Sequence, residues 1–195
     1  MIRKGAQALS REWGKRGVVP EGDVELYQYG LELMLSTLIN VLLIIGTSFI
    51  AGHPLACITY ILSLVPLRSF AGGYHAKTHW SCIAITAGSY LLLLTLAVKI
   101  AVPLIVHIAV GLVSHGVILR FAPIPAGNKP LTEEEKKRNG KTARGISWIL
   151  LALEALFVLL RLTVRVPAGM LFAGHLMSAI LLLCGRAAQK GAAKE

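Results

Sequence analysis

Charged residues are scarce in this 195-residue sequence, and cysteine is scarcer still. Only 15% of the residues are charged and 55% are hydrophobic, whereas about 25% of a soluble domain is charged. This composition excludes a disordered chain and argues against an ordinary soluble globular domain. The three cysteines exclude a secreted scaffold built on many disulfides. The polar N-terminus lacks the short apolar core of a cleavable signal peptide.

Six apolar runs make up most of the sequence, and each is a candidate membrane span. They cover about residues 33–51, 54–67, 80–98, 100–119, 145–160 and 166–185. An upright span needs about 20 residues. The second run has 14, so it must recruit flanking residues or lead into a partly re-entrant segment. The short joints between runs predict antiparallel helical hairpins. We therefore expect an all-α, polytopic integral membrane helix bundle that forms one membrane-embedded domain over residues 1–195.

Positive charge is distributed unevenly around these runs. With the N-terminus placed inside, the inner segments carry 17 of the 20 lysines and arginines, and the outer joints carry three. This is the positive-inside pattern of a multi-pass protein. It predicts that both termini and a basic loop over residues 120–144 lie on the cytoplasmic side. Because the positive charges lie outside the apolar runs, we attribute them to membrane topology and expect no nucleic-acid partner.

Residues 1–30 form a separate polar segment before the first run. Ile2, Ala6, Leu9 and Trp13 recur at helical spacing with basic residues around them. This pattern predicts an amphipathic helix lying on the anionic inner leaflet, within a cytoplasmic interfacial segment. An ordinary charged helix or a frayed terminus is the alternative interpretation.

Residues 68–82, RSFAGGYHAKTHWSC, are chemically unlike the rest of the chain. Gly72-Gly73 should break the helix, because glycine adopts backbone conformations closed to other residues. Cys82 then falls in the first turns of the third span, where a helix N-terminus and nearby cations favour a thiolate nucleophile. A histidine within hydrogen-bond reach would serve as base and then as acid.

Two histidines compete for that role. On a continuous helix His75 lies about 10.5 Å from Cys82 along the axis, whereas His79 is three residues away and a surface neighbour. Spacing alone favours His79, and His75 reaches Cys82 only if the Gly-Gly segment folds back as a loop. A metal site of His75, His79 and Cys82 lacks an obvious fourth ligand. A packing cysteine beside interfacial histidines is the plain structural alternative, and Cys57 and Cys184, inside apolar runs, are also predicted to be packing residues.

Two carboxylates are further candidates. Glu32, at the inner mouth of the first span, would orient His75 or pair with Arg68, and a structural interface role is the simpler interpretation. Glu154 lies near the middle of the fifth span, where a carboxylate is a functional candidate. Its candidate partners are His107, His115 and His175.

The order of these motifs resembles the signature of the AgrB family, integral-membrane cysteine endopeptidases of Gram-positive quorum sensing. The run that carries it is Arg68-x3-Gly72-Gly73-x-His75-Ala76-x5-Cys82. Tyr29-Gly30-x-Glu32 is similar to the family's entry motif, and the segments Arg120-Phe121-Ala122-Pro123 and Lys129-Pro130 are similar to its cytoplasmic loop. The resemblance covers most of the chain.

The resemblance implies that Cys82 is the nucleophile and His75 the base. Gly72 and Gly73 would shape the loop, and Arg68 would support it or bind substrate. The implied substrate is an AgrD-like propeptide, cut toward its C-terminal part and then closed into a thiolactone or lactone autoinducing peptide by an internal Cys or Ser. The family further implies a bacterial cell membrane and a homodimer. The charge pattern predicts that residues 68–79, and with them the active site, face the cytoplasm. We expect neither cofactor nor metal.

The acidic tail of such a substrate would suit basic residues of the 120–144 loop. The candidates are Lys129, Lys136, Lys137 and Arg138. A plain positive-inside loop is the competing interpretation. A transporter or proton-coupled carrier that uses Glu154 and intramembrane histidines is the rival function, and a membrane scaffold or sensor without catalysis is a third.

Overall fold

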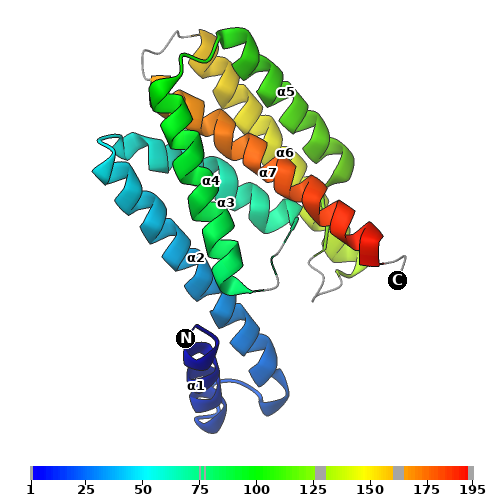
Figure 1. The fold of residues 1–195 in the computed structure, drawn as a ribbon. Helices are drawn as coiled ribbons and strands as arrows, with labels where there is room; N and C mark the ends of the chain where they lie inside the picture. The colour runs from blue at the N-terminus through cyan, green and yellow to red at the C-terminus, as the bar shows by residue number, and fades with distance from the viewer. Residues whose placement is uncertain (1, 75, 77, 126–130, 160–164, 193–195) are drawn as a thin grey trace. The chain divides into compact units, whose positions relative to one another are not determined.

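The computed structural model describes the chain except residues 1, 75, 77, 126–130, 160–164 and 193–195 (Figure 1). Its helices are α1 (Ile2–Lys15), the short 3-10 helix η1 (Glu21–Asp23), α2 (Val24–Ile50), α3 (Pro54–Ala71), α4 (His79–Lys99), α5 (Leu104–Phe121), α6 (Glu133–Leu159) and α7 (Arg165–Ala192). Within the described ranges the only β pairing is a single bridge between Gly72 and Ile124. The predicted all-α class is confirmed.

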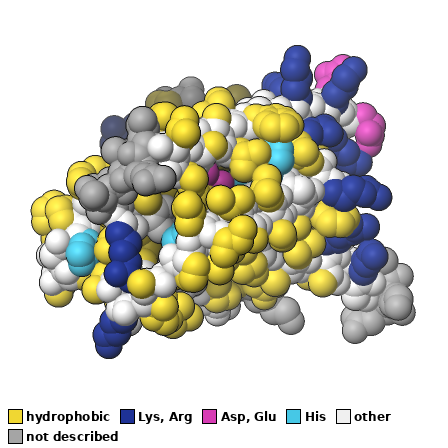
Figure 2. All heavy atoms as spheres, turned by 90° about the horizontal axis from the view of Figure 1, so that it is seen from above, with side chains coloured by type: hydrophobic (Ala, Val, Ile, Leu, Met, Phe, Trp, Pro, Cys, Tyr) yellow, Lys and Arg dark blue, Asp and Glu magenta, His cyan; other side chains and the backbone are white. Residues whose placement is uncertain are grey.

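Helices α2 to α7 are all long and apolar enough to cross a membrane, which makes the chain a multi-pass membrane protein. Their apolar side chains point largely outward: Leu38, Leu42 and Ile105 are among many that are exposed. Figure 2 shows hydrophobic side chains over most of the drawn face, and most of the lysines and arginines visible on that face lie toward the right of the view. Such a surface suits a hydrocarbon solvent, in which helices satisfy their own backbone groups.

Two predicted boundaries need correction, and a third was left open between two alternatives. The first spanning helix begins at Val24, so the end of the predicted interfacial segment belongs to α2. The second run recruits flanking residues, as one of the two alternatives predicted, because α3 continues to Ala71 and has 18 residues. The predicted loop over 120–144 is helical from Glu133 onward.

A capping box explains the early start of α6. The N–H of Thr132 donates to Glu135 Oε2 at 2.9 Å, and the N–H of Glu135 donates to Thr132 Oγ1 at 3.2 Å. These reciprocal bonds satisfy backbone donors that the helix itself leaves unpaired. Three glutamates in the first turn of α6 also favour a helix N-terminus there. The basic residues that follow are therefore carried on a helix.

The described chain divides into two compact units. Unit 1 comprises residues 1–46 and 76–89. In it the predicted N-terminal helix is confirmed as α1. Gly14 lies close to the start of α2, where an added Cβ would come within 2.9 Å of Val24 Cγ2. Ala6 is buried whereas Leu9 is exposed, and the side chain of Ile2 is outside the description.

Unit 2 comprises residues 47–75 and 90–195. Here α7 packs against α3, α5 and α6, and α6 also packs against α3 and α5 (Figure 1). Its buried core is Leu67, Ala71, Ile118, Ile124, Ala143, Leu150, Leu171 and Leu182. The expectation of a single membrane-embedded domain stays a prediction.

Small residues allow α3 and α7 to approach closely. A Cβ at Gly174 on α7 would lie 1.8 Å from Ser63 Oγ and 2.9 Å from the carbonyl oxygen of Tyr60, both on α3. Glycine at such crossings is typical of membrane helix packing. The segment that follows α3 packs against this closely packed α3–α7 pair.

Candidate active site

The Gly-Gly break has the predicted effect. α3 ends at Ala71, and Gly72 and Gly73 adopt φ values of 71° and 122°. The N–H of Ile124 donates to the carbonyl of Ala71 at 2.9 Å. A Cβ at Gly72 would lie 2.0 Å from the carbonyl oxygen of Ile124. Conformation and space both require glycine here.

The next peptide is held by two hydrogen bonds, which we call the Tyr74 clamp. The N–H of Tyr74 donates to the carbonyl of Leu181 on α7 at 2.7 Å. Arg68 Nη2 donates to the carbonyl of Tyr74, also at 2.7 Å. The clamp holds both the N–H and the carbonyl of Tyr74, the residue that directly precedes His75. His75 itself is outside the described residues.

Gly185 on α7 makes room for this segment. A Cβ there would lie 2.6 Å from the carbonyl carbon of Gly73 and 2.7 Å from the Tyr74 nitrogen. A Cβ on Gly73 would in turn lie 2.9 Å from the Leu181 carbonyl oxygen. Gly185 is not among the residues predicted from the sequence, where its only local signal is a glycine near the end of the last apolar run.

Cys82 lies where α4 begins, in unit 1. Thr78 caps this helix: its Oγ1 accepts the N–H of Ser81 at 3.1 Å, and its carbonyl accepts the N–H of Cys82 at 3.1 Å. Cys82 is a free thiol with a partly exposed side chain. Its predicted position in the first turns of the third span is confirmed. Nothing is described of the side chain of His79.

The other two cysteines differ from each other. Cys57 is buried on α3, where its Sγ donates to the carbonyl of Pro54 at 2.9 Å, as expected of a packing residue. Cys184 is exposed on α7, so its predicted packing role is wrong. The physical reason is its outward position on the helix, because not every residue of an apolar run faces the core.

The remaining candidates occupy separate places. Glu32 is buried on α2 and accepts a hydrogen bond from Gln28 Nε2 at 2.9 Å. Lys136 on α6 forms an ion pair with Glu133 at 2.6 Å, whereas Lys137 and Arg138 are exposed. Lys129 is outside the described residues. In the described part of the chain no group of three His, Cys, Asp or Glu is placed to hold a metal ion.

Glu154 has a definite partner among its three candidates. His175 Nδ1 lies 2.9 Å from Glu154 Oε1, and both side chains are buried. His107 instead packs against the ring of Phe172, with centroids 5.0 Å apart. The intramembrane carboxylate is therefore neither isolated nor part of the Gly-Gly segment.

Comparison with known proteins identifies the family. The family model described as accessory gene regulator B matches residues 2–184, nearly the whole chain. The chain belongs to the accessory gene regulator B (AgrB) family. Membership gives this AgrB-family protein a role in an accessory gene regulator quorum-sensing system.

Individual AgrB relatives agree with this assignment. Two AgrB-like proteins of Clostridium perfringens, from strains 13 and SM101, are each 28% identical over 145 residues, covering 70% of this chain and 67% of theirs. Accessory gene regulator protein B of Staphylococcus carnosus is 25% identical over 122 residues, covering 63% of this chain and 64% of its own. No solved structure matches.

Proposed function

We propose that this AgrB-family chain is a membrane-embedded cysteine endopeptidase with Cys82 as nucleophile and His75 as base. The Cys82 thiolate attacks the carbonyl carbon of the scissile peptide bond, and His75 gives its proton to the leaving amine as the C–N bond breaks. The product is a thioester on Cys82 and a free C-terminal fragment of an AgrD-like propeptide.

Ring closure follows from the thioester. An internal Cys or Ser of the peptide attacks the same carbonyl carbon, the bond to Cys82 Sγ breaks, and a thiolactone or lactone forms. Holding both ends of one peptide together makes this step effectively unimolecular. Exclusion of water by the helices would preserve the thioester until the ring closes.

The observation that carries the proposal is the position of Cys82 in a chain of this family. It is a free, partly exposed thiol at the capped N-terminus of α4, which follows directly on the Gly-Gly segment. The Tyr74 clamp supports the role of His75, because it fixes the backbone that enters that residue. Arg68, Gly72 and Gly73 then act as positioning residues, and Glu32 stays a candidate for orienting the base.

Charge supports the rest of the assignment. The excess of lysine and arginine in the segments expected to be inner supports a cytoplasmic location, in a bacterial cell membrane, for both termini and the active site. The exposed basic side chains of α1 suit its lying on anionic lipid. An acidic propeptide tail would bind the basic start of α6, through Lys129, Lys136, Lys137 and Arg138. By family resemblance the active form is a homodimer.

Intact-mass analysis of a propeptide incubated with the reconstituted protein tests the proposal. The propeptide is the one encoded next to this chain. Wild type should give two fragments or a peptide covalently held on Cys82, and Cys82→Ser and His75→Ala should give neither. Cys184→Ser, which alters another exposed thiol, should cleave normally. Cleavage by Cys82→Ser would refute the assignment, and loss in His79→Ala but not in His75→Ala would make His79 the base.

The buried Glu154–His175 contact favours one other function, a proton-coupled carrier. A carrier should keep its transport in Cys82→Ser and lose it in Glu154→Gln. A peptidase should lose propeptide cleavage in Cys82→Ser. The same two variants therefore separate the two functions.

A further inference from the structure

Four polar side chains from three spanning helices meet inside unit 2. His175 Nδ1 lies 2.9 Å from Glu154 Oε1, Ser147 Oγ lies 3.1 Å from His175 Nε2, and His115 Nδ1 lies 2.8 Å from Ser147 Oγ. Glu154 and Ser147 are on α6, His175 on α7 and His115 on α5. All four are at least nine-tenths buried. We call this hydrogen-bonded series Glu154–His175–Ser147–His115 the polar relay.

Each end of the polar relay has an atom without a partner. Glu154 Oε2 and His115 Nε2 are buried and make no hydrogen bond to the described residues. A buried polar atom left unpaired costs about 1–3 kcal/mol. Two such atoms at the two ends of one continuous series indicate that the ends have a task besides packing.

The two ends lie at different depths. Pro123 follows the C-terminal end of α5, and a Cβ at Gly140 in the first half of α6 would lie 2.9 Å from its Cδ. The end of α5 therefore adjoins the first half of α6, and the two helices run antiparallel. His115 lies two turns before the end of α5, and Glu154 lies in the second half of α6. The polar relay therefore extends along the helices, with His115 toward one end of the bundle and Glu154 toward the other.

The chemistry of the four groups allows every hydrogen bond to reverse. A neutral imidazole has one N–H and one lone pair, and a hydroxyl both donates and accepts. With Glu154 ionised, His175 Nδ1–H donates to Glu154, Ser147 O–H donates to His175 Nε2, and His115 Nδ1–H donates to Ser147 Oγ. This arrangement leaves a lone pair on His115 Nε2.

A proton delivered to His115 Nε2 would shift all three bonds. His115 passes its Nδ1 proton to Ser147, Ser147 passes its proton to His175 Nε2, and His175 passes its Nδ1 proton to Glu154. Both imidazoles end neutral with the proton on Nε2, and Glu154 ends as a carboxylic acid. The net charge of the polar relay rises from −1 to 0 with one proton taken up.

We propose that the polar relay is an intramembrane proton-transfer site that carries one proton between His115 and Glu154. Because a carboxylate is costly in a low-dielectric interior, uptake that ends on Glu154 removes the buried charge. This activity goes beyond the proposed peptide cleavage and uses none of its residues. The two proposals can therefore be tested independently.

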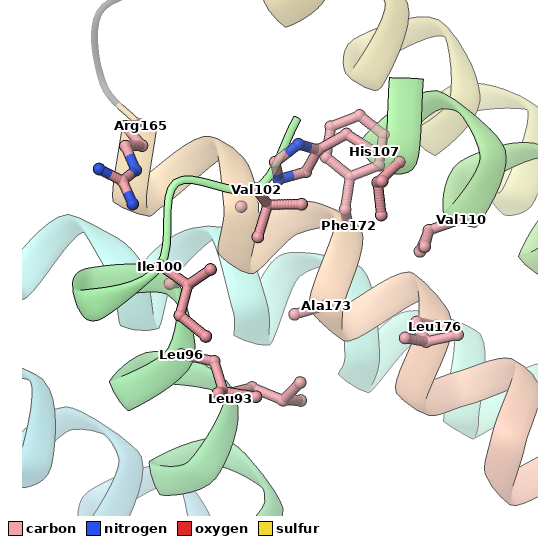
Figure 3. Close-up of a pocket in the computed structure, with 13 residues that line it drawn as sticks. Leu93, Leu96, Ile100, Val102, His107, Val110, Arg165, Phe172, Ala173 and Leu176 are labelled. Carbon is pink, nitrogen blue, oxygen red and sulfur yellow. The ribbon is translucent and has the colours of Figure 1, made fainter. Parts of the chain in front are cut away.

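A cavity lies next to the Glu154 end of the polar relay. A Cβ at Gly111 would lie 2.5 Å from Glu154 Oε2 and 3.2 Å from the Phe172 ring. Phe172 also lines a cavity of about 150 Å³ between the end of α4, α5 and α7 (Figure 3). His107 and Arg165 are its polar lining residues, and Figure 3 shows the His107 ring beside that of Phe172. The Phe172 ring therefore lies close to Glu154 Oε2 and also lines the cavity.

A serine-hydrolase triad is the other chemistry that this order of residues suggests. The distances suit a nucleophile, a base and a carboxylate. However, Ser147 is fully buried and its oxygen is also engaged by His115, which leaves no approach for a substrate carbonyl. The geometry therefore favours proton transfer.

Other titratable groups on the packed helices set the background for any titration. They are Cys57, Tyr60 and Arg68 on α3, His107 and Arg120 on α5, Glu133, Glu134, Glu135, Lys136, Lys137, Arg138, Lys141 and Arg144 on α6, and Arg165, Cys184, Arg186 and Lys190 on α7. His107 is the only other histidine on these helices, so its signal must be assigned separately by His107→Gln.

The test is a pH titration of the full chain in lipid vesicles without propeptide. Nitrogen NMR of labelled histidines reports which ring nitrogen is protonated, and infrared absorption reports a protonated carboxyl group. As the pH is lowered, we expect one transition. In it the infrared band of the protonated Glu154 carboxyl group appears, and His115 and His175 both move their proton from Nδ1 to Nε2. Glu154→Gln, which keeps the side-chain shape, should abolish the band and both shifts.

Two serine variants supply the matched comparison. Ser147→Ala should abolish the shift at His115, because the link between the two imidazoles is gone. Ser178→Ala removes a buried hydroxyl that bonds only within α7, to Gly174, and should titrate as wild type. The proposal is overturned if His175 becomes a stable imidazolium beside an ionised Glu154. It is also overturned if wild-type His115 keeps one tautomer throughout, or if Ser147→Ala leaves its shift intact.

Discussion

The main-chain N–H of Tyr74 donates a 2.7 Å hydrogen bond to the carbonyl oxygen of Leu181. This bond ties the segment that enters His75 to the last spanning helix, α7. Arg68 holds the other side of the same residue through its carbonyl. The conformation of the proposed catalytic segment therefore depends on residues far from it in the sequence.

Gly185→Ala should impair catalysis without unfolding the protein. The added methyl group would lie 2.6 Å from the backbone of Gly73 and would push the Tyr74 clamp away from α7. A displacement of about 1 Å can lower a rate about 100-fold. We expect the cleavage rate in single-turnover assays to fall at least about tenfold. Gly191→Ala, on the same helix with open space around it, is the control, and equal rates in both variants would contradict this role of Gly185.

Arg68→Lys should lower kcat rather than raise KM. A lysine keeps the charge but loses the Nη2 bond to the Tyr74 carbonyl, and a bond to a charged group contributes about 1.5–3 kcal/mol. Steady-state cleavage at several propeptide concentrations measures both constants. A rise in KM alone would show that Arg68 binds substrate instead. Arg120→Lys, at the exposed end of α5, should behave as wild type.

Removing two basic side chains at the start of α6 should weaken propeptide binding. For Lys137→Ala with Arg138→Ala we expect KM to rise about three- to tenfold with kcat unchanged, because exposed ion pairs contribute about 0.2–1 kcal/mol each. High salt should erase the difference. Lys99→Ala with Arg165→Ala removes the same charge from helix ends that we expect on the outer side, and it should leave KM unchanged. An unchanged KM in the α6 variant would show that these residues do not bind the propeptide and serve only the positive-inside topology.

Gly174→Ala should destabilise the α3–α7 pair. Its Cβ would overlap Ser63 Oγ and press on the Tyr60 carbonyl. Overpacking of this kind costs about 1–3 kcal/mol, so the thermal midpoint in detergent should fall by several degrees. Gly116→Ala on α5 has no atom near its new methyl group and should unfold like wild type. A midpoint unchanged in Gly174→Ala would mean that α3 and α7 separate easily.

The features that depend on local sequence pattern were predicted correctly. Hydropathy located all six spans, and Gly72-Gly73 located the end of α3, because both are properties of a few consecutive residues. Errors arose at helix ends. The start of α6 depends on the Thr132–Glu135 capping box, which hydropathy does not report. The exposure of Cys184 depends on the rotation of α7 about its axis, which an apolar run does not define.

By itself, the sequence determined that this is a multi-pass helical protein with a reactive-looking segment between its second and third spans. The reasons are the length of its apolar runs, the uneven positive charge, and the glycines, histidines and cysteine of residues 68–82. Only the tertiary structure decided that Tyr74 is clamped on α7 and that Glu154 connects through His175 and Ser147 to His115. Those contacts depend on how far each helix is rotated and shifted against its neighbours. Packing between distant segments sets both quantities, and no local pattern carries them.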